Sequence, residues 1–429
     1  MSERRALAAL CALVAACTLY ANASLLVTSP DALRFFPPFV AGFDANANRH
    51  LGAEYLNIAR ALATGRGYSD PFGVASGPTA WMPPVYPVLL AGLLLATGSE
   101  SAAVAIVVAA KGVVLVLTGM LVLGAARRHA RRLRPEWALL AYVVWIVCHF
   151  DWFFQITHDV WLLLLLVDAV LLGAWRLLTR GVGRRGALAW GALGGTALLT
   201  GPGVGAAWGA TALFVGWRRR AWRLTGLSLA LAASLASLWV IRNAVVFGEL
   251  VLVKSNLAYD LYQANYVSDA GVYDEPFLLR HPVWTTVRTP GSLYRTRGEQ
   301  AFLARFRERL GAAVREDPGA LVYGAARRAL AATLLYRPYR PRSEGRHPPL
   351  RTAVHPLPFL GLLALLAAWR GRPPDAIVAA TLLYAVALTP YVLAAFYLRY
   401  LLPLTPVLAL FVFWGADGAA QTWGRRPRG

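Results

Sequence analysis

Long apolar runs alternate with short basic segments along most of the chain. A transmembrane helix needs about 20 mainly apolar residues, and ten runs reach or approach this length. They occupy residues 6–27, 102–125, 137–150, 159–178, 187–199, 204–217, 222–241, 353–369, 376–395 and 400–416. The pattern predicts an all-α integral membrane protein with about ten transmembrane helices, forming a single membrane domain over residues 1–429.

The first run is also compatible with a cleaved signal peptide, because it has a basic start, an apolar middle and a small-residue A-N-A ending. The stretch "VAAC" resembles a lipoprotein cleavage site. However, about 22 apolar residues give a helix of about 33 Å, which is long enough to cross. We therefore interpret residues 6–27 as an uncleaved span, with Arg4 and Arg5 on the cytoplasmic side.

Arginine clusters fall on alternate connections between the runs, as the positive-inside rule requires. They occupy residues 127–134, 180–185, 217–223, 370–372 and 425–428. If all of them lie on the side of Arg4 and Arg5, both termini are cytoplasmic. Two long segments, 28–101 and 242–352, then become external loops, and loops of this length usually carry function.

The external loops contain further helical patterns. The segment 83–98 is apolar but short and begins with prolines, so we expect it to lie in the outer interface rather than to cross. In the second loop, residues 299–316 form an amphipathic pattern that Pro318 ends, and 320–338 is expected to be interfacial too. The arginines near 327–351 oppose the positive-inside rule. Either an external anionic ligand explains them, or the long loop obeys the rule weakly.

Composition agrees with a membrane protein, since 57% of the residues are hydrophobic and only 15% are charged, with a mean hydropathy of +0.49. The net charge of +21 does not indicate nucleic-acid binding, because arginines sit in short clusters between the apolar runs, as the positive-inside rule places them. The cysteines Cys11, Cys17 and Cys148 lie in or beside apolar segments without metal-site spacing. We interpret these three cysteines as small packing residues rather than as parts of a disulfide framework.

The first external loop places an acidic residue at the start of a predicted helix, 54–64. Tyr55 and Ile58 share one face of this helix with later apolar residues, whereas Glu54 and Asn57 share another. A glutamate in the first turn commonly compensates the helix dipole, which is the simplest interpretation. A catalytic carboxylate at the membrane surface is the alternative.

The same loop resembles the membrane-embedded GT-C glycosyltransferases, in particular the branch with protein O-mannosyltransferases and the aminoarabinose transferases of lipid A. Those enzymes follow the first span with an acidic residue near a tyrosine, an "iA..l..G.G" stretch and a "PP.YP.llA" helix. The matching elements here are Glu54, Tyr55, "IARALATGRGYS" (58–69) and "MPPVYPVLLAG" (82–92). Segments 237–265 and 396–410 also resemble that family, so the resemblance covers almost the whole chain.

The chain departs from the family at one acidic position. Many members have an aspartate three or four residues before the tyrosine, where this sequence has Leu51 and Gly52. Three alternatives remain open: Glu54 replaces the aspartate, Asp44 of "GFDANAN" does so, or transferase activity has been lost.

The resemblance implies transfer of a sugar, with inversion, from a polyprenyl-phosphate donor to the hydroxyl of an acceptor lipid, glycan or protein. The site would face outward (the periplasm) from an inner or plasma membrane. Such chemistry needs a carboxylate base and fixed cations for the leaving phosphate. The candidate bases are Glu54 and then Asp44; the candidate phosphate ligands are Arg242, Arg399 and Lys254; the candidate cleft residues are Tyr55, Asn57, Arg60, Tyr86 and Tyr400. The positions of Arg242 and Arg399 are explained equally simply if their side chains extend to the lipid headgroups (snorkelling). The position of Arg60 is explained equally simply by a solvated helix face.

Other polar residues are interpreted structurally. Lys111 is expected to pair with Asp168, and Glu299 is expected to compensate a helix end. A second cluster, His149, Asp151, His158 and Asp159, does not match a metal motif, so a divalent metal is not favoured and no cofactor is predicted. The rival functions are a lipid or solute transporter, which should show inverted repeats and mid-membrane acids, and a non-catalytic GT-C relative.

Overall fold

The computed structural model describes residues 3–22, 53–268, 281–337, 348–368 and 373–423, and in these ranges its regular elements are all helices, joined by turns and irregular segments and without a β-strand. Seven helical segments within them are long and apolar enough to cross a membrane. They are Glu3–Ala21, Glu100–His129, Val160–Arg180, Trp222–Phe247, Pro349–Ala368, Asp375–Leu393 and Leu398–Gln421. The predicted all-α membrane class is therefore confirmed, while the count of about ten crossings stays a prediction.

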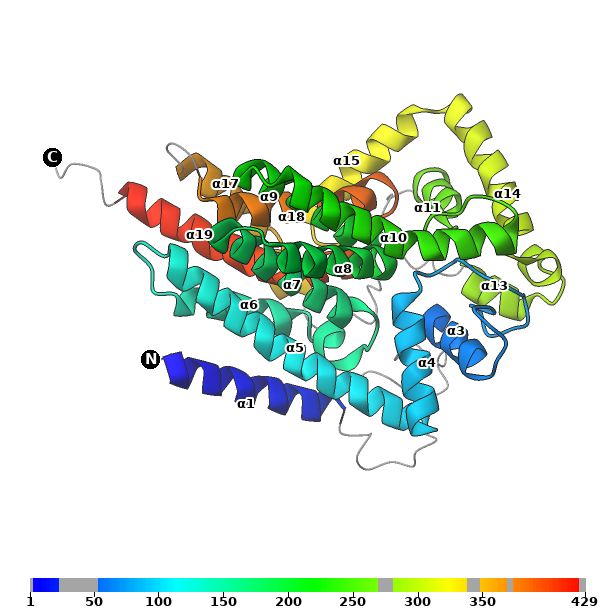
Figure 1. Cartoon of the computed structure of the whole chain (residues 1–429), viewed down its shortest axis with the longest axis horizontal. Helices are drawn as coiled ribbons and strands as arrows, with labels where there is room; N and C mark the ends of the chain where they lie inside the picture. The colour runs from blue at the N-terminus through cyan, green and yellow to red at the C-terminus, as the bar shows by residue number, and fades with distance from the viewer. Residues whose placement is uncertain (1–2, 23–52, 269–280, 338–347, 369–372, 424–429) are drawn as a thin grey trace.

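A bundle of long helices forms one part of the molecule, and its members run roughly along the long axis (Figure 1). It contains α1 (Glu3–Ala21), α5 (Glu100–His129), α6 (Glu136–Cys148), α7 (Val160–Arg180), α8 (Arg184–Thr200), α9 (Pro202–Arg219), α10 (Trp222–Phe247), α17 (Leu357–Ala368), α18 (Asp375–Leu393) and α19 (Thr405–Trp423). Helices α6, α8 and α9 match predicted spans but do not meet the length and hydropathy of the seven. Helices α6 (13 residues) and α8 (17 residues) are too short, and α9 (18 residues) ends in Arg218 and Arg219, which lower its hydropathy.

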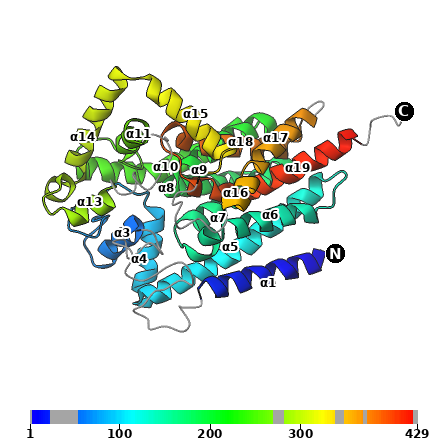
Figure 2. The same ribbon diagram turned by 180° about the vertical axis from the view of Figure 1, so that it is seen from behind.

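A cap of shorter helices lies at the end of the bundle opposite the two termini (Figures 1 and 2). It contains α3 (Ala53–Ala63), α4 (Val85–Thr97), α11 (Leu257–Tyr262), α13 (Pro282–Arg288) and α14 (Leu293–Glu316), and α15 (Gly319–Thr333) leads back to the bundle. The cap thus combines residues of both predicted external loops. Helix α4 runs across the bundle direction in both views, and its place in the outer interface stays a prediction.

Both termini lie at the other end of the bundle. There the Arg127 guanidinium hydrogen-bonds the Glu3 carboxylate, and Arg218 makes two hydrogen bonds of 2.8 Å to Asp375. Arginine clusters from separate connections therefore gather at one end, which agrees with the alternation in the sequence. Which side of a membrane this end faces stays a prediction from the positive-inside rule.

Small residues allow close helix contact inside the bundle. A Cβ atom on Gly415 of α19 would lie 2.2 Å from the backbone oxygen of Gly361 on α17. A Cβ atom on Gly191 of α8 would lie 2.6 Å from the backbone oxygen of Ser228 on α10. In a membrane, such close approach of backbones supplies the packing that apolar side chains alone do not.

Lys111 does not pair with Asp168, so the predicted ion pair is wrong. Lys111 donates to the backbone oxygens of Trp152 (3.1 Å) and Ile156. Asp168 instead accepts a hydrogen bond of 2.6 Å from the Thr118 hydroxyl. The π-helical turn η1 (Asp151–Gln155) interrupts the chain between α6 and α7, and its carbonyls offer the lysine acceptors that a continuous helix would use internally.

Two arginines of the second loop cap helix ends inside the protein. Arg328 is fully buried and donates to the backbone oxygens of Val392 (2.6 Å) and Leu393 (2.9 Å), where α18 ends. Arg351 is 5% exposed and donates to the backbone oxygen of Cys148 (2.7 Å), where α6 ends. Each satisfies carbonyls that a helix leaves unpaired. No external anionic ligand is needed to explain these two arginines.

Glu299 begins the longer part of α14, as the sequence predicts, but its side chain does more than compensate a helix end. Helix α14 begins at Leu293, with a break in helical geometry at Gly298 (φ 78°), and Glu299 follows this kink. Its side chain is 2% exposed and accepts hydrogen bonds from Ala80 N (2.9 Å), Ser255 Oγ (2.6 Å), Tyr294 Oη (2.7 Å) and Thr79 Oγ1. Glu299 therefore joins the two external loops at the centre of the cap.

Candidate functional site

Helix α3 brings Glu54 and Tyr55 to the inner side of the cap. Its apolar face is buried through Leu56, Ile58 and Ala59, and Gly65, with a positive φ of 76°, follows its end. The side chain of Glu54 is 15% exposed. Among the described residues, no side chain donates a hydrogen bond to its carboxylate, and its nearest ion-pair partner is His281 Nε2 at 3.9 Å from Oε1.

Two cations act on the Glu54 carboxyl. Burial raises its pKa above the ordinary value for glutamate, and this rise is opposed by a backbone hydrogen bond at Glu54 and then by the positive charges of Arg399 and Lys254. Arg399 belongs to the short 3₁₀ turn η3 (Leu398–Tyr400), whereas Lys254 lies just before α11. The carboxylate is therefore under the influence of two cations from distant segments and accepts no hydrogen bond from a described side chain. This arrangement is typical of a group that is used chemically.

Tyr55 and Asp159 form a second pair beside these charges. The Tyr55 hydroxyl donates to Asp159 Oδ2 over 2.8 Å. Burial, followed by the Asp159 charge, raises the pKa of this hydroxyl well above its usual range, so it stays protonated and acts as a donor. Asp159 is 7% exposed and acts electrostatically on Arg399 as well. The negative charge of Asp159 thus helps to hold a cation next to Glu54.

Arg399 is held by several neighbours. Its Nη1 donates to Nδ1 of His158 over 3.0 Å, so this ring nitrogen acts as an acceptor. Its guanidinium also lies over the rings of Tyr397 (5.6 Å) and Tyr400 (5.3 Å). The guanidinium group of Arg399 is therefore positioned before a ligand binds, which lowers the entropic cost of binding a phosphate.

Tyrosines surround this group. Tyr400 stacks on Tyr391 with ring centroids 4.0 Å apart and an interplanar angle of 8°. Tyr86 packs edge-on against Tyr55 at 5.1 Å, and its hydroxyl donates to the backbone oxygen of Thr157 over 2.5 Å. The predicted cleft residues Tyr55, Tyr86 and Tyr400 are thus close to the Glu54 region, and aromatic rings can pack against sugar faces.

His281 is a site residue that the sequence did not reveal. Its side chain is 13% exposed and faces Glu54, and its ring contacts Phe72, Trp81 and Tyr259 edge-on at 5.8–5.9 Å. Burial, together with the charges of Arg399 and Lys254, lowers its pKa to about 3, so the imidazole is neutral near pH 7. A lone histidine before Pro282 carries no local pattern that would have identified it.

Other predicted site residues have other partners or lie outside the described ranges. Arg242 donates to the backbone oxygens of Thr79 (2.8 Å) and Tyr68 (3.0 Å), so it fastens the first loop to α10. The Asn57 amide donates to the backbone oxygen of Pro71 over 3.0 Å, within the same loop. Arg60 pairs with Glu100 at 2.6 Å on the surface. Asp44 is not among the described residues. Arg242 and Arg60 therefore have partners other than Glu54, whereas Asn57 lies one helical turn after Glu54 on α3.

The second polar cluster does not converge on one point. Asp151 pairs with Arg351 at 2.8 Å, and His149 packs against the Trp145 ring at 4.8 Å. His158 and Asp159 instead face Arg399 and Tyr55, as described above. Within the described residues, no group of three or more histidines, cysteines or acids could hold a metal ion.

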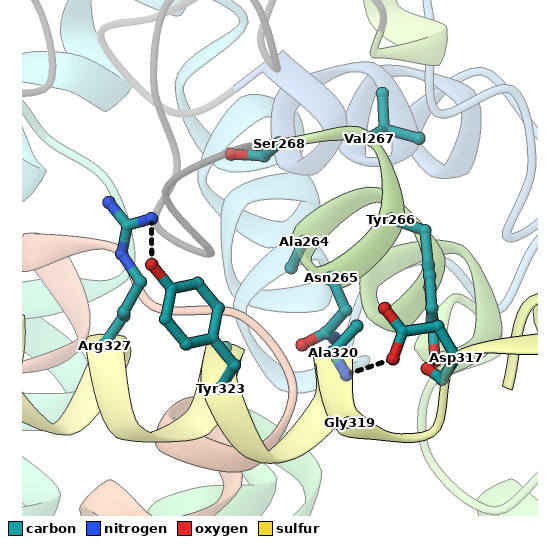
Figure 3. A pocket seen from close by; sticks show the side chains of 11 residues that line it. Ala264, Asn265, Tyr266, Val267, Ser268, Asp317, Gly319, Ala320, Tyr323 and Arg327 are labelled. Atoms are coloured by element: carbon teal, nitrogen blue, oxygen red, sulfur yellow. Dashed lines mark hydrogen bonds between the residues drawn. The ribbon is translucent and has the colours of Figure 1, made fainter.

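A separate cavity of about 370 Å³ lies between η2 (Gln263–Val267) and the start of α15. Figure 3 shows that Arg327 points toward the hydroxyl of Tyr323, to which it donates over 3.2 Å. Asp317 accepts a hydrogen bond of 3.1 Å from Ala320 N at the start of the helix. Neither Glu54 nor Arg399 lines this cavity, so we do not assign the chemistry of the site to it.

No family model, curated protein or solved structure matches the chain. The residues and their geometry are therefore the basis of any functional assignment.

Proposed function

We propose that the protein is a membrane glycosyltransferase of the GT-C type, which transfers a sugar from a polyprenyl-phosphate donor to an acceptor hydroxyl at the external, periplasmic membrane face. The observation that supports this function most strongly is the convergence of Glu54, Arg399 and Lys254. A buried carboxylate that accepts no hydrogen bond from a described side chain suits a general base. The positive charges that act on it suit a leaving phosphate, because positioned charges stabilise the charge that develops in the transition state.

In this reaction the acceptor oxygen attacks the anomeric carbon of the donor sugar. The bond between that carbon and the phosphate oxygen breaks, with inversion at the carbon, and the acceptor proton passes to the Glu54 carboxylate. Polyprenyl phosphate leaves with the bonding electron pair, and its charge is balanced by Arg399 and Lys254. Asp159 and Tyr55 position Arg399. The acceptor would be a lipid, a glycan or a protein.

Further features of the proposal concern the membrane. About ten crossings, cytoplasmic termini and an external cap would place the Glu54 site at the outer surface, where a lipid-linked donor can reach it. The cap is built from both long loops and contains Glu54, with Lys254 just before α11, whereas Arg399 comes from η3. No metal or organic cofactor is part of the proposed reaction.

The test is to compare lipids bound to the wild-type protein and to the Glu54→Gln variant after purification from cells. Glutamine keeps the shape of the side chain but cannot accept the proton, so transfer should fall by about 10²-fold to 10⁴-fold. Mass spectrometry should then find sugar-linked polyprenyl phosphate on the variant and free polyprenyl phosphate on the wild type.

The same measurement separates the rival functions. A lipid transporter would retain the same species in both proteins, because Glu54 would have no chemical step to perform. The absence of any polyprenyl phosphate from both proteins would reject the donor class. Lys254→Gln should both reduce the amount of bound lipid and slow transfer, because Lys254 balances the charge of the leaving phosphate.

A further inference from the structure

A cavity of about 280 Å³ lies at the end of the bundle that carries the termini, far from Glu54 in the fold. The end of α5 and the following turn contribute Arg128, His129 and Arg131. The floor is apolar and includes Leu365 of α17 and Trp414 of α19. A volume near 300 Å³ is the lower end of the range for small-molecule sites.

The turn after α5 is built around a buried carboxylate. Asp417 of α19 is 3% exposed and accepts hydrogen bonds from three successive backbone N–H groups, those of Arg131 (3.0 Å), Arg132 (2.7 Å) and Leu133 (2.7 Å). It also accepts from Gln421 Nε2 (3.0 Å). Asp417 is the one acidic residue among the described residues that line the cavity, and its carboxylate therefore accepts hydrogen bonds from four donors.

The same network positions a cation. Oε1 of Gln421, whose amide is held by Asp417, accepts a hydrogen bond of 3.2 Å from Arg131 Nη1. The Arg128 side chain makes no hydrogen bond or ion pair with a described residue, whereas the adjacent Arg127 is paired with Glu3. Among the described residues that line the cavity, two arginines, Arg128 and Arg131, stand against the single carboxylate of Asp417.

Two further observations indicate an amphipathic anion. Trp414 is 2% exposed, and its buried indole N–H has no acceptor among the described residues. Beside the cavity, α17 presents exposed leucines along its outer face, with Leu363 at 45% and Leu366 at 58%. A ligand with a phosphate and long apolar chains would match the cations, the N–H donor and this leucine surface together.

We propose that this cavity binds the phosphate headgroup of an anionic phospholipid, with Arg128 and Arg131 as its cationic ligands. The acyl chains would extend along the leucine surface of α17. Basic pockets between transmembrane helices bind such headgroups by the same combination of charge and apolar contact. The site is independent of the proposed transfer reaction, because it lies at the opposite end of the bundle.

The experiment compares the wild-type protein with the double variant Arg128→Gln, Arg131→Gln. Each protein is placed in vesicles of phosphatidylglycerol and phosphatidylcholine, extracted, and analysed by native mass spectrometry for retained lipid. The wild type should retain phosphatidylglycerol in preference to phosphatidylcholine, and the double variant should lose this preference by about tenfold or more. Both side chains are exposed and the backbone bonds to Asp417 remain, so the variant should fold.

The matched control is Arg184→Gln, Arg185→Gln, which removes two exposed arginines at the start of α8, at the same end of the bundle. This control variant should keep the wild-type preference for phosphatidylglycerol. If it loses the preference as much as the Arg128→Gln, Arg131→Gln variant does, diffuse surface charge explains the binding and the proposal is overturned. Inorganic phosphate is titrated in parallel. If phosphate alone displaces phosphatidylglycerol at equimolar concentration, the site binds the free anion and the lipid assignment is wrong.

Discussion

The cap contains two buried glutamates whose surroundings differ. Glu299 accepts four hydrogen bonds from groups of both external loops. Glu54 receives none from the side chains of the described residues, and it lies opposite His281 and the cations Arg399 and Lys254. A buried carboxylate that accepts several hydrogen bonds stabilises a fold, whereas one that accepts few costs stability and remains available for a proton.

The same contrast separates two arginines. Arg242 donates hydrogen bonds to the backbone oxygens of Thr79 and Tyr68, and its guanidinium lies 4.9 Å from the centre of the Trp239 ring. Arg399 is positioned by side chains, His158 and the tyrosines around it. Residue type and position near a helix end do not distinguish the two, but their hydrogen-bond partners do.

The largest expected difference concerns the stability of the cap. Glu299→Ala removes four hydrogen bonds and leaves buried donors unpaired, so it should destabilise the protein by about 3 kcal/mol or more. Glu54→Gln should not destabilise it. The pKa of Glu54 is raised by burial, so its ionised form opposes folding once the pH exceeds that pKa, and a neutral glutamine removes this cost.

Thermal unfolding followed by tryptophan fluorescence measures both effects. Glu299→Gln is the conservative control, and it should fall between the other two variants because an amide can satisfy part of the site. A lower unfolding temperature for Glu54→Gln than for Glu299→Ala would reverse the assignment of the two glutamates.

The next prediction concerns the two arginines. Arg399→Ala should weaken binding of undecaprenyl phosphate by about tenfold to a hundredfold, because a hydrogen bond to a charged group contributes about 1.5–3 kcal/mol. Arg242→Ala should leave the affinity unchanged and instead lower the unfolding temperature, since two loop carbonyls lose their donor. Titration of the detergent-solubilised protein with the lipid measures the affinity, and equal losses in both variants would remove the distinction.

The smallest expected effect is on the pH dependence of transfer. Glu54 must be ionised to accept a proton, so activity should fall as the pH decreases through its raised pKa, at a higher pH than an ordinary glutamate would give. Lys254→Gln removes a charge that lowers this pKa, so the fall in transfer rate at acid pH should occur at a higher pH than in the wild type. Initial rates across the acid range measure this shift. A shift of the fall to lower pH would contradict the role of Lys254.

The sequence determined the class of the protein and several local features. Apolar runs near 20 residues require helices in a bilayer, because backbone groups must pair within the segment. The 3.6-residue period also placed Glu54 at the start of α3 and made α14 amphipathic. These features depend on residues close together in the chain. The transfer reaction itself remains a proposal supported by the resemblance and by the charges around Glu54.

Only the tertiary structure decided which polar residues meet. Residues 54, 254, 281 and 399 come from segments far apart in the chain, and no local period reports such contacts. It also assigned Lys111 to backbone carbonyls rather than to Asp168, and Glu299 to the joint between the loops. The physical reason is that buried polar groups must find partners wherever packing places them, and packing is set by all the helices together.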